Sequence, residues 1–209
     1  FAIGLLSSCI GGGSDGGFED LIGGNISDVD ELTIISTSPS GNTLTIDVGD
    51  SQSFSIFAQT PPPATVSYYF TLDGTNVSNT NTYDLTGTIP LIGNRTVTAY
   101  ATDGTATKSK SWTVKVNGAP DVTGAYATAP KVAYGSPLAL TVTGTDPNGD
   151  PMTWAWTLGA CAAGSGSASS TLVGTNNTAV FTPDISLVGC VKIFVTATDD
   201  SAASDTYSF

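Results

Sequence analysis

The stretch Val48–Gly74 (VGDSQSFSIFAQTPPPATVSYYFTLDG) and the stretch Tyr134–Gly159 (YGSPLALTVTGTDPNGDPMTWAWTLG) follow the same plan. Each runs from a turn into a strand of alternating apolar and polar residues, then through a proline-containing turn into an aromatic strand. The parallel resumes at Val97–Val116 and Val195–Phe209. A repeat of this length is typical of tandem domains, so we expect two copies of one β-rich unit.

Short strands are expected throughout both units, and no amphipathic helix of useful length is expected. In the first unit they are Leu32–Ser36, Thr43–Val48, Ser53–Gln59, Val66–Leu72, Thr82–Leu85, Thr96–Thr102 and Lys108–Val116. In the second they are Val122–Ala127, Leu138–Thr145, Met152–Leu158, Thr178–Thr182, Val191–Thr198 and Thr206–Phe209. Strands of this length predict β-sandwiches. We therefore expect an extended segment at residues 1–30, a first sandwich at 31–117 and a second at 118–209, whose last strand is incomplete.

Composition agrees with an all-β protein of two small domains. The 209 residues are 40% hydrophobic and 11% charged, and they include no His and one Met, which suits two ordinary cores better than an elaborate enzyme. The formal net charge is −12, and no Lys or Arg precedes Arg95. Because nucleic acids and anionic lipids are bound through basic side chains, the charge disfavours both as partners. It favours solubility outside the cell.

The turn Asp146-Pro-Asn-Gly-Asp-Pro151, followed by Trp154 and Trp156, resembles the immunoglobulin-like modules of the PKD and cadherin-like kind found in bacterial surface proteins. The first unit has Pro61–Pro63 at the same turn and aromatic residues on the next strand. The resemblance implies two tandem immunoglobulin-like β-sandwich domains. Such domains occur in adhesins, surface enzymes and extracellular fibres, so the fold does not assign a function by itself.

The three cysteines suggest one disulfide bond and one separate thiol. Cys161 follows the aromatic strand and Cys190 precedes the strand at 191–198, so the two could meet across the sandwich and bond. A disulfide would place the protein in an oxidising compartment. The alternative is a pair of reduced, buried thiols that behave as small hydrophobic residues.

The segment Leu6–Cys9 resembles the bacterial lipobox, with a Leu three positions before a Cys and small residues between. The glycine-rich run after Cys9 resembles the tether of a lipoprotein, so Cys9 is expected to carry a lipid or to bond to another chain. Alternatively, Phe1–Ile10 is a strand donated to another copy, whose incomplete strand near Phe209 accepts it. The residues expected in this self-association are Phe1, Ile3, Leu5, Tyr207 and Phe209.

Asp146, Asn148 and Asp150 place three oxygen-bearing side chains at alternate positions of one turn, which predicts a candidate Ca²⁺ site. Asp121 or Asp199 could add a ligand. The alternative is that these residues simply form the turn. Sequons for N-glycosylation, relevant if the source glycosylates exported proteins, begin at Asn25, Asn76, Asn94 and Asn176.

Two matches to catalytic motifs in the segment Gly11–Gly16 are accidents of a glycine-rich tether. Neither lies between a strand and a helix, and the chain has no His to serve as a base for Ser14. Trp112, Trp154 and Trp156 could stack on sugar rings, but Trp154 and Trp156 share one face of a strand, so at least one is expected in the core. Catalysis is not expected.

We therefore expect an exported, non-enzymatic surface protein with a structural or adhesive role. The leading version is a self-associating subunit of a surface filament built by strand donation. The alternative is a monomeric surface lipoprotein whose immunoglobulin-like module binds a glycan or a protein. A third version is an accessory domain of a longer surface hydrolase.

Overall fold

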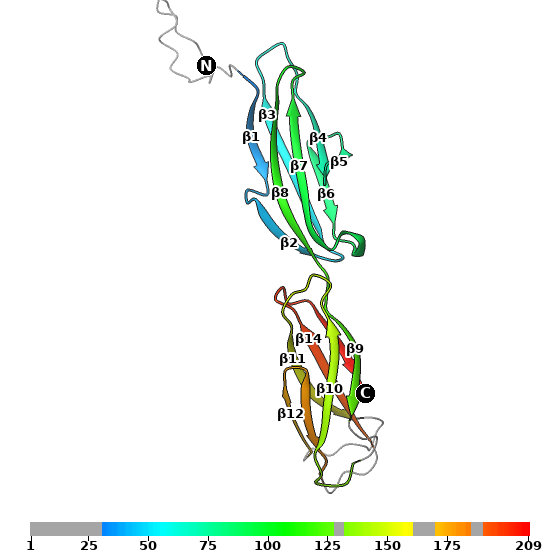
Figure 1. Cartoon of the computed structure of the whole chain (residues 1–209). Coiled ribbons are helices and arrows are strands. Elements are labelled where there is room, and N and C mark those ends of the chain that lie inside the picture. Colours follow the sequence, from blue (N-terminus) through cyan, green and yellow to red (C-terminus); the bar gives the residue numbers. More distant parts are fainter. Residues whose placement is uncertain (1–30, 128–131, 161–169, 185–189) are drawn as a thin grey trace, which may run out of the picture.

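The computed structural model describes residues 31–127, 132–160, 170–184 and 190–209. They form two β-sandwiches that follow one another along the chain and lie end to end (Figure 1). Strands β1–β8 build the first sandwich and strands β9–β15 build the second, and no sheet is shared between them. The predicted all-β fold of two tandem sandwiches is confirmed. Within these ranges, no helix is long and apolar enough to cross a membrane.

The first sandwich packs a three-stranded sheet against a five-stranded sheet. The smaller sheet has the order β1-β3-β6, with bounds Thr33–Ser38, Ser51–Gln59 and Thr82–Thr86. The larger sheet has the order β2-β8-β7-β4-β5, with bounds Thr43–Asp47, Thr107–Asn117, Gly93–Thr102, Ser67–Leu72 and Thr75–Ser78. A 3-10 turn, η1, spans Ile89–Leu91. The strand β2 pairs in parallel with β8, which sets Asp47 opposite Asn117.

Alternation along the strands builds the core of the first sandwich. On β3 the side chains of Phe54, Ile56 and Ala58 are buried while their neighbours are not, as expected for a strand with one face inward. Trp112 on β8 is 1% exposed and lies edge-on to Phe54, with ring centroids 5.1 Å apart. Its Nε1–H donates to the Pro39 carbonyl at 2.8 Å, so the polar atom of the ring is satisfied.

The described residues of the second sandwich form seven strands in two antiparallel sheets. The four-stranded sheet has the order β12-β13-β10-β9, with bounds Thr171–Thr175, Thr178–Thr182, Leu138–Thr145 and Asp121–Ala127. The three-stranded sheet has the order β11-β14-β15, with bounds Thr153–Ala160, Val191–Thr198 and Ser204–Ser208. In chain order this is the ABED and CFG arrangement of an immunoglobulin constant domain.

Both tryptophans of β11 pack against the core of the second sandwich, as predicted for at least one of them. Trp156 also donates from Nε1 to the Asn176 carbonyl at 2.9 Å. A Cβ atom at Gly174 on β12 would overlap the Trp156 ring. Glycine is therefore what lets this ring lie directly against the neighbouring strand.

The strands β5 and β12 were not predicted from the sequence. Each is half of a short hairpin, and each hairpin turns through residues with positive φ. Asp73 and Gly74 have φ of 49° and 85° between β4 and β5, and Asn176 has φ of 52° between β12 and β13. Asp-Gly and Asn are the residues that such two-residue turns prefer. These turn residues were therefore the sequence signal that could have predicted the two hairpins.

The predicted Cys161–Cys190 disulfide lies partly outside the described residues, but the strands beside the two cysteines are described. The strands β11 and β14 are neighbours in one sheet, and Ala160 pairs with Val191 at the end of their ladder. In the sequence, Cys190 directly precedes Val191 and Cys161 directly follows Ala160. Cys190 is disulfide-bonded. Its pairing with Cys161 stays a prediction because Cys161 lies outside the described residues.

Candidate functional site at the junction of the two domains

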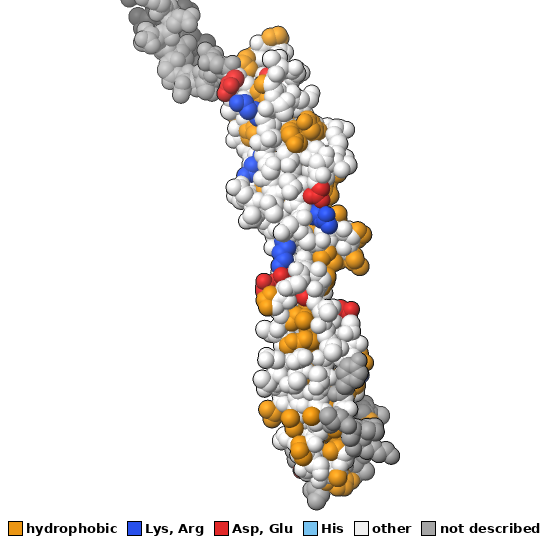
Figure 2. Space-filling model, in the orientation of Figure 1, with side chains coloured by type: hydrophobic (Ala, Val, Ile, Leu, Met, Phe, Trp, Pro, Cys, Tyr) orange, Lys and Arg blue, Asp and Glu red, His pale blue; other side chains and the backbone are white. Residues whose placement is uncertain are grey.

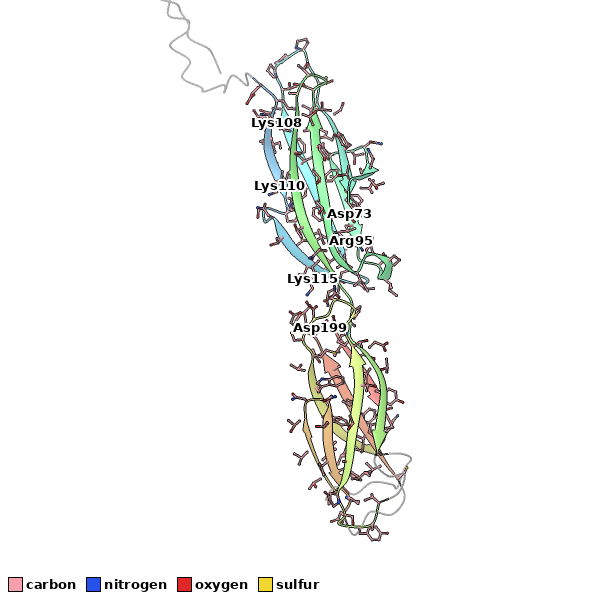
Figure 3. All side chains as sticks on the ribbon, viewed as in Figure 1. Asp73, Arg95, Lys108, Lys110, Lys115 and Asp199 are labelled. Carbon is pink, nitrogen blue, oxygen red and sulfur yellow. The ribbon has the colours of Figure 1, made fainter. Side chains whose placement is uncertain are left out.

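The junction brings the end of β8 against two loops of the second sandwich. The strand β8 ends at Asn117 and β9 begins at Asp121. The loop at residues 146–152 between β10 and β11 and the loop at 199–203 between β14 and β15 both contact the end of β8. Figure 3 shows Lys115 on β8 and Asp199 on the facing loop close to this junction. Polar and charged side chains therefore connect the two sandwiches.

Asp146 shapes the first of these loops. Its Oδ1 accepts hydrogen bonds from the backbone N–H groups of Asn148 and Asp150, at 2.8 and 3.0 Å. Gly149, with φ of 78°, lies in the left-handed region that glycine adopts readily. Asp146 therefore helps to form the turn through Oδ1, which leaves Oδ2 of the same carboxylate for another role.

Asn148 bridges the two sandwiches. Its Oδ1 accepts the backbone N–H of Gly118 at 2.8 Å, and its Nδ2 donates to the Val116 carbonyl at 3.0 Å. A Cβ at Gly118 would lie 2.7 Å from Ile92 Cδ1 and 2.8 Å from Pro147 Cγ, so glycine allows the close approach. Both polar atoms of the Asn148 carboxamide are thus engaged with the segment that links the domains.

Asn117 is fully buried, at 0% exposure, and holds a carboxylate from each domain. Its Nδ2 donates to Asp47 Oδ1 at 3.1 Å and to Asp199 Oδ2 at 2.9 Å. Asp199 is 6% exposed, and its Oδ1 accepts the backbone N–H groups of Ser201 and Ala203, both at 2.9 Å. One side chain therefore ties β2, β8 and the second loop together.

Lys115 is the basic residue of this network. Its Nζ lies 2.7 Å from Asp150 Oδ2 and 3.6 Å from Asp200 Oδ1. The hydrogen bond to Asp150, supported by the charges of Asp150 and Asp200, raises the pKa of Lys115 above its usual value. Five carboxylates, on Asp47, Asp146, Asp150, Asp199 and Asp200, share this network with one ammonium group.

Three of the carboxylates converge. One oxygen each from Asp146, Asp150 and Asp199 lies within 4.8 Å of the others. Asp146 Oδ2 and Asn117 Oδ1 are buried and accept no hydrogen bond from any residue in the described ranges. Buried polar atoms are rarely left without a partner, because the lost hydration is costly. Two residues of the predicted calcium site, Asp146 and Asp150, belong to this cluster. Its third member is Asp199 and not the predicted Asn148.

Sequence reasoning missed Asn117, Asp47 and Lys115 as members of this site. Asn117 lies 70 and 82 residues from the two carboxylates that it holds. No local pattern signals contacts over such separations. The available hint was the acidic turn at 146–150 together with Asp199, one of two residues expected as an additional ligand.

The other predicted site residues lie elsewhere. Three sequon residues, Asn76 on β5, Asn94 on β7 and Asn176 in the β12–β13 turn, are exposed. Tyr207 packs partly against the second core, and its ring centroid is 6.4 Å from that of Phe209, which is 36% exposed. The predicted residues outside the described ranges are Phe1, Ile3, Leu5, Cys9, Asn25 and Cys161.

The sequence matches no protein-family model and no curated protein. The structure resembles solved immunoglobulin-domain proteins. One is the crystal structure of the N-terminal eight Ig domains of Down Syndrome Cell Adhesion Molecule, with a TM-score of 0.52 and 15% identity over 79% of this chain and 25% of that one. Another is an Ig-domain fragment of titin carrying Glu-to-Ala changes, with a TM-score of 0.53 and 13% identity over 86% of this chain and 64% of that one.

This likeness is one of fold, and it agrees with the strand order of the two sandwiches. The chain spans less than two thirds of each of these solved fragments. The molecule is therefore an immunoglobulin-like tandem of two domains, and its function has to be argued from its own surfaces.

Proposed function

We propose that this chain is an exported structural or adhesive protein of the cell surface, and that it associates with further copies of itself by strand addition. The observation that carries the proposal is a difference between equivalent strands of the two sandwiches. In the first, β2 covers the outer edge of β8. In the second, β15 is the last strand of its sheet, and none of the described residues pairs with its outer edge.

The ladder between β14 and β15 defines which backbone groups of β15 face outward. Ile193 and Phe209 exchange both backbone hydrogen bonds, at 2.8 and 3.1 Å. Since bonded and non-bonded pairs alternate in an antiparallel ladder, every second residue before Phe209 also turns its backbone groups toward β14. The residues that turn these groups outward are Ser204, Thr206 and Ser208.

An exposed row of N–H and C=O groups is a template for a strand from another chain. The donor that we propose is Phe1–Ile10, which lies outside the described residues. Its apolar residues at alternate positions, Phe1, Ile3 and Leu5, would supply one apolar face to the acceptor sheet. Repetition of this exchange from copy to copy would build a filament.

Outward apolar side chains on both sandwiches support additional contacts with partners. Phe57 on β3 is 58% exposed and lies beside Ile35, which is 54% exposed at the bulge of β1. Val173 on β12 is 67% exposed and pairs with Val180 on β13. Apolar side chains grouped on a surface favour association.

The Ser208→Pro variant tests the proposal. Proline removes the outward N–H of Ser208 and adopts the extended backbone of an edge strand, so the ladder to β14 is expected to persist. We expect the full chain to gain mass with concentration in sedimentation velocity, while Ser208→Pro remains at 21.1 kDa. Ser208→Ala, which keeps the N–H, serves as the matched control and is expected to associate like the original chain.

Two results would contradict strand addition at this edge. One is association of Ser208→Pro equal to that of Ser208→Ala. The other is a full chain that remains a monomer at every concentration, which would favour a monomeric lipoprotein held at the surface through Cys9.

A further inference from the structure

We propose that the carboxylate cluster at the domain junction binds one Ca²⁺ ion, with ligands from Asp146, Asp150 and Asp199 and with Asn117 beside them. The ion would be held by side chains of the second sandwich, one of which, Asp199, is hydrogen-bonded to Asn117 at the end of β8. It would therefore fasten the second domain to the end of β8. The ligand set differs from the sequence prediction because Asn148 is engaged with the linking segment and Asp199 comes from a different loop.

The spacing of the oxygens suits this ion. Oxygen ligands bind Ca²⁺ at about 2.3 to 2.6 Å, so two oxygens on opposite sides of one ion are at most about 5 Å apart. The three carboxylate oxygens lie within 4.8 Å of one another. Side chains from two different loops therefore already have a separation that one ion can bridge.

The two unpartnered oxygens are the independent evidence for a ligand. Asp146 belongs to the cluster, and its Oδ2 is buried and accepts no hydrogen bond among the described residues. Asn117 is 0% exposed, its carboxamide contacts Asp199, and its Oδ1 is likewise without a partner in that part of the chain. A bound cation would give Asp146 Oδ2 a partner, because Ca²⁺ is bound by carboxylate oxygens.

The negative charge of the cluster also favours a bound cation. Asp199 is almost fully buried and the Asp150 side chain is 15% exposed, while Lys115 contacts Asp150 and Asp200. Grouped carboxylates with one ammonium leave a negative excess in a poorly hydrated place, which is costly unless a cation compensates it. All the candidate ligands are oxygens, which favours Ca²⁺ over the transition metals that prefer nitrogen and sulfur.

Calorimetric titration of the full chain with CaCl₂ at 0.15 M NaCl tests the proposal. We expect one Ca²⁺ per chain, with a dissociation constant of about 10⁻⁴ to 10⁻³ M, the range of extracellular modules. Asp199→Asn keeps the shape of the side chain and is expected to weaken binding about tenfold or more, because one anionic ligand is lost. Glu31→Gln, at the far end of the first sandwich, is the charge-matched control and should bind like the original chain.

Lys115→Met gives a second test that does not depend on how well Asp199→Asn folds. Removing an ammonium 2.7 Å from Asp150 relieves repulsion of the incoming ion, so Ca²⁺ binding should tighten about threefold or more. A structural role for the acidic cluster alone would give no such gain. The proposal is overturned if the full chain takes up no Ca²⁺, if Asp199→Asn binds as tightly as Glu31→Gln, or if Lys115→Met weakens binding.

Discussion

Asp103 closes the turn between β7 and β8 with both oxygens of its carboxylate. Oδ1 accepts the backbone N–H groups of Ala106 and Thr105, at 2.8 and 2.9 Å, and Oδ2 accepts the Thr60 hydroxyl at 2.7 Å. The hydrogen bond from Ala106, followed by those from Thr60 and Thr105, lowers the pKa of Asp103 below its ordinary value. The turn is thus stabilised by the ionised form.

The lowered pKa predicts a dependence of stability on pH. Because the folded value lies below the unfolded value, the contribution is fully present above the unfolded pKa of about 3.9 and is lost as pH falls through the folded value. Asp103→Asn should therefore lower the melting temperature at pH 7 and flatten its decline below pH 4. Thermal unfolding from pH 7 to pH 2.5 measures this, with the exposed Asp50→Asn as control. An unchanged acid slope in Asp103→Asn would be the contrary result.

For single residues, the sequence predicted burial better than it predicted polar contacts. At least one of Trp154 and Trp156 was expected in the core because they share one face of a strand, and both pack against it. Asn117 follows a run of alternating core residues on β8, yet its role depends on Asp47 and Asp199, which only the folded chain brings near. Periodicity reports which face is buried. It does not report which distant polar groups meet there.

For the strands, the alternation of apolar and polar residues was a good predictor wherever one face of the strand is buried. The strands β3, β7 and β14 have such patterns, and their predicted positions agree closely with the observed bounds. The strands β5 and β12 are short edge strands with few buried residues, so no period of two is present to be read. The sequence alone did not show that β11 and β14 are neighbours in one sheet, because such pairing joins segments far apart in the chain.

The hairpin β12–β13 depends on the contact between Gly174 and Trp156. A methyl group at Gly174 would overlap the indole ring, and either the ring or β12 would have to move. Gly174→Ala should lower the free energy of unfolding of the second domain by about 1 to 3 kcal/mol, as overpacking typically does. Thr175→Ala, an exposed change on the same strand, should remain within about 0.5 kcal/mol of the original chain.

Urea denaturation followed by tryptophan fluorescence measures both variants of the hairpin. Equal stability of Gly174→Ala and Thr175→Ala would show that β12 yields to the methyl group without cost, contrary to the packing described above.

At the scale of the whole molecule, the two sandwiches form an elongated body whose charges are unevenly spread. On the face shown in Figure 2, the Lys and Arg side chains lie over the first sandwich and at the junction, and acidic side chains lie beside them at the junction. The composition predicted the overall acidity, with 18 acidic against 6 basic residues. It could not predict that several carboxylates converge between the domains, because they come from β2 and from two separate loops.

The central claim is that β15 receives a strand from another copy, and hydrogen exchange at its outward amides tests this most directly. The informative amides are those of Ser204 and Ser208, because the Thr206 N–H donates to Asp205 Oδ1 at 2.8 Å within the chain. At concentrations where the full chain gains mass, we predict that both amides exchange slowly, and that protection disappears on dilution. Rapid exchange at both positions under all conditions would contradict strand addition at β15.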